Sequence, residues 1–216
     1  TLFRSDYAAI KNGSYGKLMK AYYAKQDAEK LSGKGDTSQK LTLMKTSADS
    51  LKKSADALND SSLWEKKKIK KKDEKTGEEI EVEDYDWDKI TKAVKSFVED
   101  YNDVVKEAGE SNTKDVLRNA SWMTGMTDKN SNMLAKIGIT IGKGNKLELD
   151  EDALKQADIS SLKTVFTGYN SFVSKISQKA TGISNAANRA SATYTNNGTY
   201  SKTDSSLTSS KIDKEV

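Results

Sequence analysis

The sequence predicts a mainly α fold: an elongated antiparallel helical bundle or coiled coil with two β-hairpins. Two long segments repeat apolar residues at the spacing of a heptad, a pattern that needs a partner helix to cover it. The 216 residues include no proline, a residue that interrupts helix interiors. Hydrophobic residues make up 35% and charged residues 31%, so thin helical layers fit better than a large spherical core.

The first segment, residues 1–36, is predicted to hold a short helix and a linker. Asn12-Gly13 is a turn signal, and Tyr15 and Tyr22 then lie on one face of the short helix. The glycine-containing stretch Leu31-Ser-Gly-Lys-Gly-Asp36 predicts a flexible break before the bundle.

The helical bundle is expected to span residues 37–194, with Thr37 or Ser38 opening its first long helix. The apolar residues of this helix follow at steps of three and four: Leu41, Met44, Ala48, Leu51, Ala55 and Leu58. A second helix repeats the same steps: Trp87, Ile90, Val94, Phe97, Tyr101, Val104 and Ala108. Two such helices separated by about 28 residues should pack antiparallel with their apolar faces together.

A hairpin is predicted between these helices, near residues 63–84, because a lysine run is followed by a run that alternates Glu with apolar residues. We expect Ile69 opposite Ile80, which sets lysines against glutamates: Lys66, Lys68 and Lys70 against Glu83, Glu81 and Glu79. A basic patch for nucleic acid or anionic lipid is the alternative. The acidic residues neutralise the lysines, and this favours a solvated hairpin.

The second half of the chain is predicted to begin with a helix from Asn112 to Lys136, broken at Gly125. A second hairpin is expected at residues 137–149, where apolar and polar residues alternate around a turn at Gly142-Lys-Gly-Asn145. Asp150 then caps a short helix. The last helix should run near Tyr169 to Tyr194, followed by a polar tail over residues 195–216.

The composition excludes several kinds of chemistry. Without His or Cys the chain has no imidazole base, thiol nucleophile or thiolate metal site. Gly142-Lys-Gly-Asn-Lys lacks the further glycine or the Gly-Lys-Ser/Thr of a phosphate loop, and Asp84-x-Asp86-x-Asp88 lacks the glycine of a calcium loop. We therefore expect no enzyme, no cofactor and no metal.

The three tryptophans are further candidates for ligand binding. Trp87 lies on the heptad seam, which favours core packing, whereas Trp64 and Trp122 are open to a ligand role. The net charge of +4 is too small to indicate nucleic acid. No apolar run approaches the length needed to span a membrane.

Four short motifs carry a family resemblance. They are Ala93-Val-Lys-Ser-Phe-Val-Glu-Asp-Tyr-Asn102, Leu134-Ala-Lys-Ile-Gly-Ile-Thr140, Lys146-Leu-Glu-Leu-Asp-Glu-Asp-Ala-Leu154 and Leu162-Lys-Thr-Val-Phe-Thr-Gly168. In this order, over residues 90–170, the chain resembles the C-terminal region of the bacterial flagellar filament-capping family, flagellar hook-associated protein 2. It looks like a reduced relative, with a Lys/Glu hairpin where that family has large β-rich outer domains.

The resemblance implies a non-enzymatic structural or assembly protein. Its implied partners are proteins, either flagellin-like helices or a second copy of the chain. Its implied location is the bacterial flagellum outside the cell. A cytoplasmic location is the alternative. The alternative is a stand-alone surface or ligand-binding module with no flagellar role, and a hydrolase using carboxylates comes third.

Candidate interaction residues fall in two groups. Tyr15, Tyr22 and Tyr23 would form an N-terminal contact face or pack onto the bundle. Ile176, Ile183 and Ala187 would serve an intermolecular coiled coil or the internal bundle, of which the internal arrangement is favoured.

Overall fold

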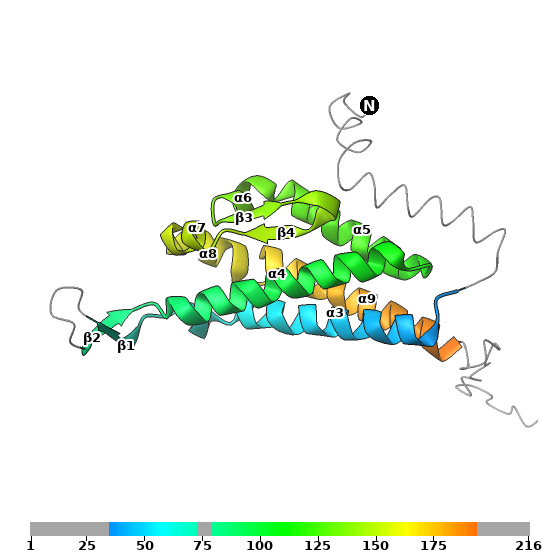
Figure 1. Ribbon diagram of the computed structural model, residues 1–216, viewed down its shortest axis with the longest axis horizontal. Helices are drawn as coiled ribbons and strands as arrows, with labels where there is room; N and C mark the ends of the chain where they lie inside the picture. The colour runs from blue at the N-terminus through cyan, green and yellow to red at the C-terminus, as the bar shows by residue number, and fades with distance from the viewer. Residues whose placement is uncertain (1–34, 73–78, 194–216) are drawn as a thin grey trace, which may run out of the picture.

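The computed structural model describes residues 35–72 and 79–193, which form an elongated helical bundle (Figure 1). Its elements in chain order are α3 (Ser38–Asn59), the 3-10 turn η1 (Ser61–Trp64), β1 (Lys67–Lys72), β2 (Glu79–Asp84), α4 (Trp87–Glu110), α5 (Lys114–Lys129), α6 (Ser131–Ala135), β3 (Ile139–Ile141), η2 (Lys143–Asn145), β4 (Leu147–Leu149), α7 (Glu151–Gln156), α8 (Ile159–Phe166) and α9 (Phe172–Thr193). The strands form two antiparallel two-stranded sheets. The predicted mainly α class with two hairpins is confirmed.

The heptad seams of α3 and α4 form the centre of the core. All the apolar seam residues predicted for α3 are buried, and so are those of α4 except the half-buried Trp87. Asp36, just before α3, binds the turn that follows α4, so the two helices run antiparallel as predicted. Thr37 is the N-cap of α3, and its hydroxyl accepts a hydrogen bond from the Lys40 amide at 3.3 Å.

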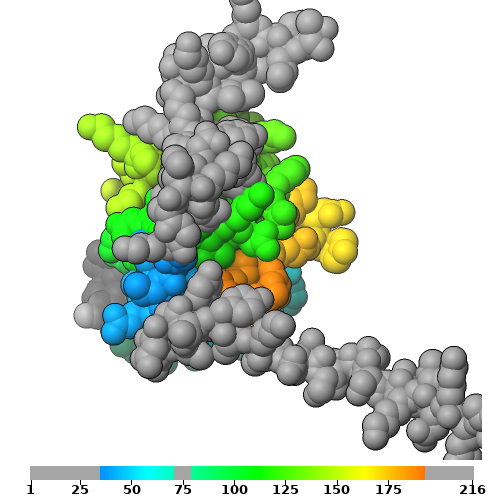
Figure 2. Space-filling model, turned by 90° about the vertical axis from the view of Figure 1, so that its right-hand side faces the viewer, coloured from blue at the N-terminus to red at the C-terminus, as the bar shows by residue number. Residues whose placement is uncertain are grey.

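Helix α9 completes the bundle by packing along α3 and α5. It runs antiparallel to α3, because the Ser177 hydroxyl donates to Asp56 and the Ser184 hydroxyl donates to Asp49, each at 2.6 Å. Figure 2, which views the bundle from one end, shows the start of α3 beside the end of α9. Helix α5 also contacts α4, because the Tyr101 hydroxyl of α4 donates a hydrogen bond to the Thr127 hydroxyl of α5 at 2.9 Å.

The second hairpin, β3 and β4, lies against α4 together with the short helices (Figure 1). The Asn102 side chain fixes it there by pairing with the backbone of Leu147, donating to its carbonyl at 2.9 Å and accepting from its amide at 2.7 Å. The turn falls at Gly142 to Asn145 as expected, and Asp150 caps α7 by accepting from the amides of residues 152 and 153.

The first hairpin forms, but its predicted register is wrong by two residues. Ile69 pairs with Val82, whereas we expected Ile80 as its partner. A shift of two residues keeps every side chain on the predicted face, so lysines still oppose glutamates: Lys68 with Glu83, Lys70 with Glu81 and Lys72 with Glu79. The same register extended by one pair sets Lys66 beside Tyr85, and the Lys66 ammonium lies 5.7 Å from the centre of that ring.

Two expected helix boundaries are also wrong. Gly125 does not break its helix: α5 continues to Lys129, because its neighbours Met123, Thr124 and Thr127 are buried and offset the modest cost of a helical glycine. The last helix starts at Phe172 rather than at Tyr169, whose side chain is 82% exposed.

The three tryptophans have different surroundings. Trp64 is buried: its indole N–H donates to the Leu58 carbonyl at 2.8 Å, and its ring stacks on Phe166 at 5.4 Å. It therefore closes the end of the core beneath the first hairpin and offers no ligand platform. Trp122 is 61% exposed.

Candidate interaction surface

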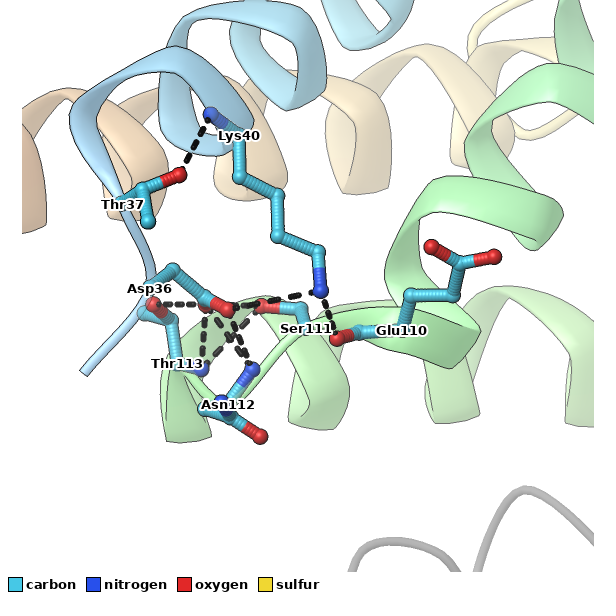
Figure 3. A network of polar contacts seen from close by, with 7 residues as sticks. All are labelled: Asp36, Thr37, Lys40, Glu110, Ser111, Asn112 and Thr113. Atoms are coloured by element: carbon cyan, nitrogen blue, oxygen red, sulfur yellow. Dashed lines mark hydrogen bonds and ion pairs between the residues drawn. The ribbon is translucent and has the colours of Figure 1, made fainter. Parts of the chain in front are cut away.

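A polar cluster at one end of the bundle is connected by a network of hydrogen bonds (Figure 3). The Asp36 carboxylate accepts from the Ser111 hydroxyl at 2.6 Å, from the Asn112 amide at 2.8 Å, and from both the amide and the hydroxyl of Thr113 at 2.8 and 2.7 Å. The Lys40 ammonium lies 3.9 Å from the same carboxylate and donates to the Glu110 carbonyl. This cluster joins the start of α3 to the turn between α4 and α5.

The electrostatics of Asp36 show that the cluster is structural. Burial raises the pKa of its carboxyl, but the hydrogen bonds from Ser111, Asn112 and Thr113 outweigh burial and hold that pKa below its usual value. A carboxylate with these partners is satisfied as an anion and is a poor proton donor or nucleophile at neutral pH.

A second acid, Asp100, has the opposite shift. It lies in a groove of about 390 Å³ between α3 and α4, lined by small residues and lysines. Burial raises the pKa of its carboxyl, a hydrogen bond with Ser54 opposes this, and repulsion from Asp103 and Glu99 adds to it. A hydrolase that uses carboxylates as acid and base needs two acidic side chains that face each other. Asp100 is the one acidic residue among those that line this groove.

The most exposed tryptophan of the described residues lies where α5 meets α9. The Lys179 ammonium lies 5.4 Å from the centre of the Trp122 ring. Lys175 and Arg189 are exposed on α9, a helix without an acidic residue, and Arg118 is exposed on α5. We call these five residues the Trp122 surface.

The Trp122 surface is basic despite one acidic neighbour. Asp115 pairs with Arg118 at 3.0 Å and with Arg189 at 3.5 Å. One carboxylate shared between two guanidinium groups leaves excess positive charge. Exposed Trp and Arg are the residue types that dominate binding energy in protein interfaces.

Close packing of α5 and α9 shapes this surface. A Cβ atom at Gly182 would lie 2.6 Å from the Asn119 side-chain oxygen, so a larger residue there would require the Asn119 side chain to move. Towards the start of α5 the two helices flank an open hollow of about 340 Å³, lined by Thr113, Lys114, Asp115, Ala186, Arg189 and Ala190.

The candidate residues predicted from sequence are not gathered at this surface. Ile176, Ile183 and Ala187 have 0% exposure and fill the core of the bundle. Tyr15, Tyr22 and Tyr23 lie outside the described residues. Sequence reasoning left Trp122 open but missed Arg118 and Lys179, although the absence of acidic residues in α9 was a readable signal.

The described residues offer neither a metal site nor a membrane-spanning helix. Within residues 35–72 and 79–193, no three acidic side chains come together in a way that could hold a metal ion. In the same part of the chain, none of the helices has the length and apolar character needed to cross a bilayer.

Comparison with known families assigns the second half of the chain. Residues 111–215 match the family described as flagellar hook-associated protein 2 C-terminus. Neither a curated protein nor a solved structure matches the chain. The match contains three of the four motifs identified above and leaves residues 93–102 outside it. The resemblance to the C-terminal region of flagellar hook-associated protein 2 is therefore confirmed over residues 111–215.

Proposed function

We propose that this chain is a structural or assembly protein of the bacterial flagellum that works without catalysis, by binding other proteins outside the cell. The observation that carries the proposal is the family match over residues 111–215. The described carboxylates agree with it, because Asp36, Asp49 and Asp56 are each held by hydrogen bonds that fix one helix to another.

The Trp122 surface is the proposed contact for a flagellin-like helix. It offers an exposed indole for apolar contact and several cations for the carboxylates of a partner. The small residues Ala186 and Ala190 beside it leave room for a helix to approach.

Co-sedimentation with flagellin filaments from the same bacterium tests this function. We expect the wild-type chain to sediment with filaments and Trp122→Ala to bind at least about tenfold more weakly, the usual loss for a central tryptophan. Leu43→Ala is the matched control, since Leu43 is 50% exposed on α3, away from this surface.

Either of two results would contradict the proposal. A wild-type chain that stays in the supernatant at every filament concentration would exclude filament binding. Equal losses for Trp122→Ala and Leu43→Ala would exclude the Trp122 surface as the contact. A ligand-dependent rise in melting temperature without any protein binding would instead favour a stand-alone binding module.

A further inference from the structure

The first hairpin is a two-stranded sheet with both strands at an edge. Strands β1 and β2 pair only with each other among the described residues, and they project beyond the end of the bundle (Figure 1). An isolated two-stranded hairpin is marginally stable in water. Each strand also presents an outer row of backbone N–H and C=O groups that can pair with another strand.

The hairpin gains little from its own charges. The Lys70 ammonium lies 3.6 Å from the Glu79 carboxylate, but these side chains are 70% and 62% exposed, so solvent screens the pair. Ile80 is 40% exposed. A further strand would pair the backbone groups that an outer edge leaves open.

The two edges differ in charge, and this selects the strand that each can accept. Strand β1 is lysine with a single isoleucine, and β2 alternates acidic and apolar residues. A second β1 beside β1 would set lysines against lysines, and β2 beside β2 would set glutamates against glutamates. A β2 strand beside the outer edge of β1 repeats the lysine–glutamate pairing found within the hairpin.

We propose that β2 of a second copy of this chain adds, antiparallel, to the outer edge of β1. In the register found within the hairpin, Lys68 and Lys70 of one copy lie opposite Glu83 and Glu81 of the next. This is strand addition at an exposed sheet edge, with charge selecting its partner. This contact involves no residue of the Trp122 surface and does not depend on a flagellar role.

The contact is directional. The second copy uses β2 in the contact and keeps its own β1 edge open, so it can accept a third copy. Contacts of this kind close into rings or continue as filaments.

Crosslinking of single-cysteine variants tests the contact, because the chain has no cysteine of its own. We would mix Lys70→Cys with Glu81→Cys and add a short bis-maleimide. In the proposed register these positions face each other between copies. The mixture should give crosslinked dimers at about tenfold or more above either variant alone, because like strands repel.

Lys70→Cys mixed with Asn188→Cys is the matched control, since Asn188 is exposed on α9, far from the hairpin in sequence and on another element. Far-UV circular dichroism checks that each variant keeps its helix content. A test mixture that crosslinks no more than this control would overturn the proposal. So would equal crosslinking of Lys70→Cys alone.

A charge-reversed hairpin gives a second, independent readout. The variant K68E/K70E/E81K/E83K keeps opposite charges paired within the hairpin and exchanges the signs of the two lysines and two glutamates that meet in the proposed contact. It should associate with itself and not with wild type, as native mass spectrometry of an isotopically labelled mixture would show. Free mixing of the two forms would contradict charge selection. Because the Trp122 surface is unchanged, this result is separable from filament binding.

Discussion

At the scale of single residues, hydrogen-bonded carboxylates hold the helices together. Asp36 is 8% exposed and serves two elements, since it precedes α3 and accepts hydrogen bonds from residues 111–113. Sequence reasoning placed it in a flexible break, because nothing local distinguishes it. Its partners lie about 75 residues further along the chain, and no local pattern of sequence reaches that far.

Asp36→Asn tests the importance of this residue. We expect a loss of roughly 2 kcal/mol in the free energy of unfolding at pH 7, the range for a hydrogen-bonded charged group. Because the folded pKa of Asp36 lies below its usual value, its contribution is complete above the unfolded pKa of about 4 and is lost as pH falls through the folded pKa. Urea unfolding at pH 7 and pH 3 would show it: the difference between variant and wild type should shrink at pH 3, and a constant difference would refute the electrostatic account.

At the scale of elements, periodic segments were predictable and junctions were not. The seams of α3 and α4 follow from apolar spacing, because a face that repeats at heptad spacing must be covered. The hairpin register was not predictable, since shifts of two residues preserve the faces and several Lys–Glu pairings are equivalent. The Trp122 surface also escaped sequence reasoning, because it forms only where two helices distant in sequence meet.

Two glycines allow the cost of backbone strain to be distinguished from the cost of a steric clash, because only one of them lies close to neighbouring atoms. Gly138 and Gly144 both have positive φ, at 79° and 73°. A Cβ at Gly138 would lie 2.6 Å from the Asp150 carbonyl oxygen, whereas a Cβ at Gly144 meets nothing within 4 Å. Gly144→Ala should cost about 1 kcal/mol for strain alone, and Gly138→Ala about 2–4 kcal/mol.

Thermal unfolding of both variants would measure the difference. Gly138 also accepts the amide of Asp150 at 2.8 Å, so a shift of this backbone would disturb the cap of α7. Equal melting temperatures for the two variants would show that the α6–β3 junction adjusts more easily than the distances imply.

At the scale of the whole molecule, α9 joins the two halves of the bundle. It packs on α3 and on α5, and its buried face is rich in small residues that bring the backbones close together. Ala187 has 0% exposure and the neighbouring Asn188 is exposed. The same substitution at these two adjacent positions therefore compares its effect on stability in the core with its effect at the surface.

Ala187→Lys should unfold the bundle or lower its stability by about 4 kcal/mol or more, because the core offers the ammonium neither space nor a partner. Asn188→Lys should change stability by less than about 0.5 kcal/mol, as for most surface substitutions. Far-UV circular dichroism during a thermal scan compares the two. A folded, stable Ala187→Lys chain would place α9 outside the core.

The two serine–aspartate bonds between α3 and α9 have a mechanical consequence. Asp49 and Asp56 are seven residues apart, and so are their partners Ser184 and Ser177. Burial raises the pKa of both carboxyls, but hydrogen bonds from lysine and serine outweigh it and leave both pKa values lowered. Because the bonds repeat with the period of the helices, sliding α9 along α3 breaks both together, so a pulling force along the long axis is shared between two equal bonds.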